Sequence, residues 1–242
     1  MASSAVLSLP AIRDLNHRGI ELMAQAARRS RDSRLSLIGT LQRELRESTP
    51  ATRARAADRP FLLLDLEFGN AAWWQTVVRG PNRRIRRELL QPAFPRSAAL
   101  PLARATLTAI WRSVCTDARS ARILFGLNES VARLFVDLPV TAIDPIAHHA
   151  HPHLRPRWAD HPAFWRGLFR AGISEDDAEL AQIDIQGLQL LTSEPLIATT
   201  QQNTRLFAGT RKNRQKTNPS GIADVSVSDS AVTTVGTRPY CR

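Results

Sequence analysis

Apolar side chains recur at steps of three and four residues along most of this chain, the period that gathers side chains on one face of an α-helix. Residues 10–29 show this period first, and their common face holds Ile12, Leu15, Gly19, Leu22 and Ala26. The same period returns as far as about residue 194. We therefore predict a mainly α protein, in a multi-helix orthogonal or bundle arrangement, with at most one short strand and a disordered C-terminal tail.

Capping and turn residues between the apolar runs set the expected boundaries. A second helix is expected from Ser33, an N-cap residue, to Ser48, joined to the first as a helical hairpin. Residues 49–60 are expected to be a linker, residues 79–96 a loop and residues 148–160 an irregular stretch. Further helices are expected near Asn70, Leu100, Asn128, Pro139, Phe164 and Ser174, with Gly126 ending the longest.

One segment, residues 60–68, has the two-residue period of a strand instead. Its apolar side chains alternate with Asp65 and Glu67, which predicts a short strand with both carboxylates on one face. Paired carboxylates can bind magnesium or act as acid and base. Because no third acid stands nearby in the sequence, a solvated strand face is the better interpretation.

Charge and composition divide the chain into four segments. Residues 1–59 form a basic helical hairpin with a linker, and residues 60–95 a short strand, a short helix and an arginine-rich loop. Residues 96–199 form a helical module, and residues 200–242 a polar tail that holds both lysines, which predicts disorder. The net charge of +11 divides among them as +5, +2, −1 and +5. Positive charge therefore lies outside the nearly neutral helical module.

Arginine clusters are the strongest candidates for contacts with nucleic acid. The run from Arg79 to Arg87 holds five arginines in nine residues, and the guanidinium fork suits phosphate and guanine edges. The predicted contact residues are Arg79, Arg83, Arg84, Arg86, Arg87, Arg155, Arg157, Arg211, Lys212, Arg214 and Lys216. A solvated basic loop, a functionless tail and an arginine bias from a GC-rich genome are the alternatives. DNA is nevertheless the partner we expect.

The sequence offers little for catalysis or metal binding. The run from His148 to His153 holds four histidines, which are common metal ligands, but a helix end followed by a polar loop is the better interpretation. Cys115 is expected in the core, and with Cys241 it forms neither a disulfide framework nor a cysteine zinc site. Phosphate-loop and nucleophile-elbow motifs are absent. We therefore expect no cofactor, no metal, no small-molecule substrate and no enzymatic activity.

The expected compartment is the cytoplasm. No apolar stretch approaches the roughly 20 residues that span a bilayer, and the N-terminal residues lack the pattern of a secretory signal. Two distant cysteines fit a reducing environment. These observations predict a protein with no membrane partner.

Residues 121–132 contain a short motif: an alanine, then Gly126, an apolar residue, Asn128, Glu129 and a second alanine. This motif resembles the FlhD family of flagellar transcriptional activators, which has these residue types at these spacings. The resemblance extends over about residues 104–194. Apolar positions of the family are matched by Leu138, Val140, Ile146 and Ala147, and its basic, aromatic and histidine positions by Arg157, Trp158 and His161.

The resemblance implies a bacterial, helical, oligomeric activator of transcription that binds DNA and has no enzymatic activity. Residues 20–50 are in turn similar to the N-terminal part of FlhC, the partner subunit, although the zinc-binding cysteines of FlhC are absent. Leu154 stands where the FlhD family often has a cysteine used for an interchain disulfide, so association through residues 96–199 would depend on packing. A protein–protein interaction module, such as an assembly partner or an anti-activator of a mobile genetic element, is the alternative.

Overall fold

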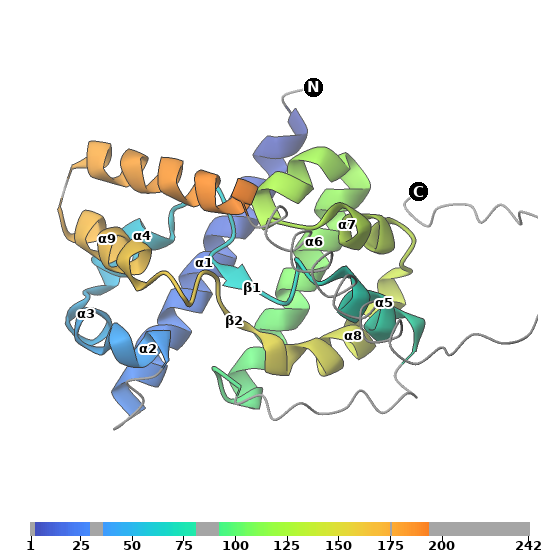
Figure 1. Cartoon of the computed structure of the whole chain (residues 1–242), viewed down its shortest axis with the longest axis horizontal. Coiled ribbons are helices and arrows are strands. Elements are labelled where there is room, and N and C mark those ends of the chain that lie inside the picture. Colours follow the sequence, from blue (N-terminus) through green and yellow to red (C-terminus); the bar gives the residue numbers. More distant parts are fainter. Residues whose placement is uncertain (1–2, 30–35, 81–91, 175, 194–242) are drawn as a thin grey trace, which may run out of the picture.

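The structure, a computed structural model, describes residues 3–29, 36–80, 92–174 and 176–193. The described residues form ten α-helices and one sheet of two short strands (Figure 1). The prediction of a mainly helical protein is confirmed. The tail predicted at residues 200–242 lies outside the described residues.

Two long helices, α1 (Ser3–Arg29) and α6 (Arg96–Phe125), pack against each other at the centre of the molecule (Figure 1). Ile12 and Leu15 on α1 are buried as predicted, whereas Leu22 is half-buried at the margin of that face. The far end of α1 lies close to the start of α6. The two helices therefore form a spine on which the other elements pack.

The helix expected between Ser33 and Ser48 is divided in two. Its described part begins at Ser36, whose hydroxyl accepts a hydrogen bond from the N–H of Gly39. It comprises α2 (Leu37–Thr40) and α3 (Gln42–Glu47), with Leu41 between them. Ile38, Leu41 and Leu45, spaced three and four residues apart, form its buried apolar face.

The linker predicted at residues 49–60 is wrong, because these residues hold helix α4 (Pro50–Ala57). The Thr49 hydroxyl accepts from the N–H of Thr52, and Pro50 stands in the first turn, where its missing N–H leaves no bond unmade. Ala56 and Ala57 are buried in the packing of α4 against α1 and α9 (Pro162–Ile173). A Thr-Pro pair that resembled a loop is therefore a helix start.

Strands β1 (Leu64–Asp65) and β2 (Arg155–Pro156) pair antiparallel, with Leu64 opposite Pro156 and Asp65 opposite Arg155. The strand expected at residues 60–68 is thus only two residues long. Its second strand lies in the stretch expected to be irregular, and sequence reasoning missed it. The pairing joins two segments about 90 residues apart and anchors the candidate residues described below.

Asn16 on α1 positions the chain that leads into β1. Its Nδ2 donates to the carbonyl oxygens of Ala57 and Phe61, at 3.2 and 2.8 Å, and its Oδ1 accepts from the N–H of Leu63 at 2.7 Å. Asn16 is completely buried. A single side chain on α1 therefore holds the end of α4 and the residues just before β1 against the two long helices.

The other expected helices are present. Asn70 caps α5 (Ala71–Arg79) and Asn128 caps α7 (Glu129–Val136) through their side-chain oxygens. Gly126 ends α6 with a φ of 62°, a left-handed conformation that glycine adopts without strain. Pro139 precedes η1 (Val140–Ala142), α8 (Ile143–Ala150) and η2 (His151–His153).

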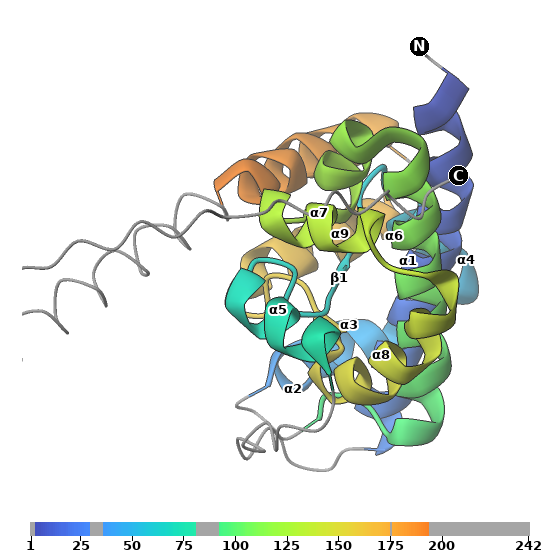
Figure 2. The same cartoon turned by 90° about the vertical axis from the view of Figure 1, so that its right-hand side faces the viewer.

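A last helix covers residues 177–193 and follows Asp176, whose carboxylate accepts from the N–H of Ala178. The expected start at Ser174 is thus displaced by two residues. Gly187 packs so closely on Phe61 that a Cβ at this position would overlap the ring. This helix lies at the periphery of the molecule in both views, as the orange helix of Figures 1 and 2.

A single hydrophobic core joins the segments that sequence composition separated. Buried residues extend from Ile12 on α1 to Leu191 on the last helix and belong to one contiguous cluster. The boundaries predicted after residues 59 and 95 therefore do not separate distinct cores.

Cys115 differs from its prediction. It is half-buried on α6 and disulfide-bonded, whereas a core thiol was expected; Cys241 lies outside the described residues. Cysteine content therefore gives no support for a reducing compartment. Across the described ranges, no helix has the length and apolar character needed to cross a membrane.

Candidate nucleic-acid interface

The predicted contact residues do not gather into one surface. Arg79 is exposed at the last position of α5. Arg155 and Arg157 lie in and beside β2. Arg83, Arg84, Arg86, Arg87, Arg211, Lys212, Arg214 and Lys216 lie outside the described residues.

Arg157 is not available to a phosphate, because it is only 2% exposed. Its guanidinium donates to the carbonyl oxygen of Phe125 at 2.9 Å and more weakly to that of Leu62 at 3.4 Å. A carboxylate oxygen of Asp65 lies 4.0 Å away, and the ring of Phe68 lies beneath the guanidinium. The prediction that Arg157 binds nucleic acid is therefore wrong in this conformation, since the guanidinium ties α6 to the approach of β1.

Arg155 is partly exposed but already neutralised. Its Nη2 lies 2.8 Å from Asp65 Oδ2, and its Nη1 lies 2.9 Å from Glu67 Oε1. These two carboxylates outweigh burial and raise the pKa of Arg155. Asp65 and Glu67 are themselves largely buried, so the solvated face predicted for them is wrong. A phosphate would have to displace both carboxylates to reach this arginine.

The histidine run ends at this cluster. His153 Nδ1 lies 3.9 Å from Glu67 Oε1, and its ring packs against Trp73 at a centroid distance of 4.6 Å. His153 lowers the pKa of Glu67; burial opposes this shift, and Arg155 adds to it. Among the residues that the structure describes, no group of three or more His, Cys, Asp or Glu side chains is placed to hold a metal. The run forms the end of α8 and the turn η2, as expected.

Two further arginines, like Arg157, are buried and make ion pairs or hydrogen bonds inside the protein. Arg53 pairs with Glu21, and Arg59 pairs with Asp184 at 3.0 Å and donates to the carbonyl oxygen of Leu180 at 3.3 Å. Burial raises the pKa of Asp184, and Arg59 opposes that shift. These arginines are buried, so part of the arginine content that indicated phosphate binding instead connects helices.

The charge of the described residues is modest. They hold 20 arginines and 16 carboxylates, a net charge of +4, so the rest of the chain carries +7 of the total +11. Of that remainder, residues 81–91 carry +3 and residues 194–242 carry +4. The described fold therefore supplies only part of any attraction to a polyanion.

One basic surface does exist, where α1 ends and α6 begins. Arg28, Arg29 and Arg96 are exposed there, and within the described ranges no carboxylate pairs with them. We call these three arginines the basic corner. Sequence reasoning missed them, although the adjacent pair Arg28-Arg29 at the end of a helix was a visible signal. Arg28 and Arg29 could instead have a purely structural role, because positive charge at the C-terminal end of α1 stabilises the helix dipole.

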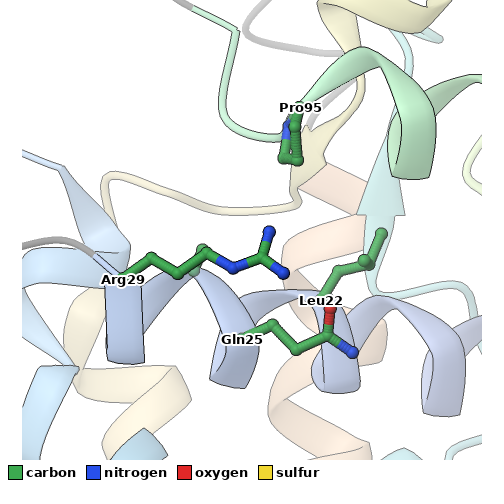
Figure 3. A pocket seen from close by; sticks show the side chains of 5 residues that line it. Leu22, Gln25, Arg29 and Pro95 are labelled. Carbon is green, nitrogen blue, oxygen red and sulfur yellow. The ribbon is translucent and has the colours of Figure 1, made fainter.

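A shallow cavity of about 320 Å³ lies beside the basic corner. Leu22, Gln25 and Arg29 line it from α1, and Pro95 faces them from the start of α6 (Figure 3). Nearby, burial lowers the pKa of His151, and Arg96 acts in the same direction through its positive charge. The exposed guanidinium groups of Arg28, Arg29 and Arg96 make this surface positively charged.

Comparisons with known proteins identify no relative: no protein-family model, no curated protein and no solved structure matches this chain.

Proposed function

We propose that this protein is a DNA-binding transcriptional regulator of the activator type that acts as a helical homo- or hetero-oligomer. The basic corner is the observation that supports this proposal most directly. Arg28, Arg29 and Arg96 are exposed, cationic and without a described carboxylate partner. Arginines of this kind donate to phosphate oxygens and release counterions when they do so.

Further arginines stand next to the basic corner in the sequence. Arg31 and Arg34 follow the end of α1 in the sequence, and the four arginines at positions 83, 84, 86 and 87 precede Pro92 and the start of α6. These neighbouring segments add arginines to the sequence on either side of the residues that form the basic corner.

The resemblance of residues 104–194 to the FlhD family adds to the proposal, since that family activates transcription. We propose, as part of the same function, that the protein acts in the cytoplasm without a cofactor or catalytic activity. The proposed DNA-binding residues therefore no longer include Arg155 and Arg157. They now include Arg28, Arg29 and Arg96.

A salt titration of DNA binding tests the proposal. Full-length protein should bind duplex DNA at low salt, and the logarithm of the binding constant should fall linearly with the logarithm of salt concentration. The variant R28S/R29S/R96S should bind more weakly, with a slope shallower by about 0.9 for each phosphate that it no longer neutralises. R133S is the matched control, because Arg133 is exposed on α7 and paired with Glu129. Absence of DNA binding by the full chain at low salt would overturn the proposal.

A non-enzymatic protein–protein interaction module is the second candidate. It is favoured by the last helix, which contains no basic residue yet exposes Ile185 and Leu188. This function predicts a defined protein complex that survives nuclease treatment. Recovery of nucleic acid alone would count against it.

A further inference from the structure

Cys115 lies on α6 and takes part in a disulfide bond. The structure contains a single chain, so the second sulfur comes from that chain. The sequence has two cysteines, and the other is Cys241, which lies outside the described residues. The count of cysteines alone therefore identifies Cys241 as the partner, 126 positions further along the sequence.

The sulfur of Cys115 stands where a soluble thiol can approach it. Cys115 is half-buried, at the margin between the exposed Arg112 and Thr116 and the buried Val114. A disulfide is broken when a thiolate attacks one of its sulfur atoms, so access to the sulfur decides whether the bond is permanent or exchangeable. The position of Cys115 fits an exchangeable bond better than a bond sealed in the core.

Positive charge lies close to Cys115. Arg112 is three residues earlier on the same helix, a spacing that brings two side chains together, and within the described ranges it forms no ion pair. Arg119 is exposed four residues later. The intervening carboxylate, Asp117, accepts hydrogen bonds from the backbone N–H groups of Arg119 and Ser120 and from the Ser120 hydroxyl. Cationic neighbours of this kind are typical of reactive cysteines.

The chain can return to Cys115 without strain. The last helix ends beside the end of α6, because Leu191 packs on Gly126 so closely that a Cβ at position 126 would overlap it. Gly126 follows Cys115 by eleven residues, or about 16 Å along a helix. The connection from residue 193 to Cys241 has 48 residues, which reach about 160 Å when fully extended. The connection is therefore several times longer than the distance that it has to span.

We propose that Cys115 and Cys241 form a reversible intrachain disulfide, a redox-controlled tether that fastens the segment of residues 194–242 to α6. This segment has a net charge of +4. With the tether closed it is attached to the fold at two points, and with the tether open at one. The inference adds regulation by redox state to the proposed function but does not depend on DNA binding.

A low-molecular-weight disulfide such as oxidised glutathione is the oxidant. The two cysteine thiols lose their protons and one S–S bond forms between them, while the S–S bond of glutathione breaks and is reduced to two thiols, which take up the two protons. The exchange passes through a mixed disulfide of glutathione with one of the cysteines. An excess of reduced glutathione drives the same exchange backward and opens the tether.

Peptide mapping of the full-length chain tests the bond. The chain is equilibrated with oxidised glutathione, remaining thiols are blocked with iodoacetamide, and the digest is analysed by mass spectrometry without reduction. Peptides that contain Cys115 and Cys241 should be found linked, and the intact chain should keep its single-chain mass of 26.9 kDa on a non-reducing gel. A disulfide-linked species of twice that mass, or two blocked thiols after oxidation, would overturn the proposal.

Brief trypsin treatment tests the tether itself. Cleavage within residues 211–216 should leave the C-terminal fragment attached to the oxidised chain, and reduced glutathione should then release it. C115S and C241S should each release the fragment without reduction. T116S is the matched control, because it changes the neighbouring exposed residue and keeps both cysteines. Release from the oxidised wild type without reductant, retention by either serine variant, or failure of reduced glutathione to free the fragment would contradict the tether. No step uses DNA, so a failure of DNA binding would be distinguishable.

Discussion

Asn16 offers the most direct test of how the fold is held together. Replacing it with leucine keeps the approximate volume but removes three buried hydrogen bonds to the backbone. Their costs differ. The carbonyl oxygen of Ala57 also accepts from the N–H of Arg59, so it keeps a partner. Within the described residues, the Phe61 carbonyl oxygen and the Leu63 N–H have no hydrogen-bond partner other than Asn16.

Two buried backbone groups are thus left unsatisfied, at about 1–3 kcal/mol each. We expect N16L to lose roughly 4 kcal/mol of unfolding free energy, measured by urea denaturation followed by helical circular dichroism. The exposed cap variant N70A is the control and should lose about 1 kcal/mol. A loss for N16L no larger than that of N70A would refute this account of Asn16.

The variant N16D adds a signature that a simple packing defect would not show. Its carboxylate can accept from Leu63 but would face the carbonyl oxygens of Ala57 and Phe61, so its pKa in the folded state should lie above the unfolded value of about 3.9. The folded state then binds more protons than the unfolded state, and stability falls as pH rises through that range. N16D should therefore recover stability relative to wild type as pH falls from 7 toward 4.

Three other tests, two of them with a control variant, probe features of the fold. R59M should lower the unfolding free energy by about 3–5 kcal/mol, because it leaves the half-buried Asp184 without its partner. R55M should lower it by at most about 1 kcal/mol, because its partner Asp177 is almost fully exposed. Equal losses for the two variants in urea denaturation would contradict this reasoning. G126A should cost more than about 1 kcal/mol, since φ is 62° and a Cβ would overlap Arg157, and G69A, with open space around it, should be nearly neutral. Glu67 has a lowered folded pKa, so its stabilisation is present above the ordinary value of 4.5 and is lost as pH falls below it; E67Q should flatten this acid limb, and an unchanged pH profile would contradict the assignment.

Features set by local chemistry were predictable from the sequence. Asn70 and Asn128 cap helices because their side chains accept hydrogen bonds two or three residues on, and Gly126 ends α6 because it tolerates a positive φ. No distant residue is needed for these contacts.

Features set by distant contacts were not predictable. β2 exists only because β1, some 90 residues earlier, pairs with it. Arg157 was assigned to nucleic acid by its type, but its acceptors are carbonyl oxygens of Leu62 and Phe125, which no local pattern indicates. The basic corner arises because the end of α1 and the start of α6 meet in space. Composition indicated a polyanion partner without indicating which arginines are free to reach it.

The close packing of the last helix has a consequence for how the chain emerges during synthesis. Gly187 covers Phe61, and β1 lacks its strand partner until Arg155 and Pro156 have been made. A nascent chain that ends before residue 177 therefore leaves apolar surface of the first third uncovered. Long-range pairing of this kind slows folding and exposes intermediates to aggregation. We expect the native core to close only after nearly 190 residues have left the ribosome, so chains truncated earlier should depend on chaperones to remain in solution.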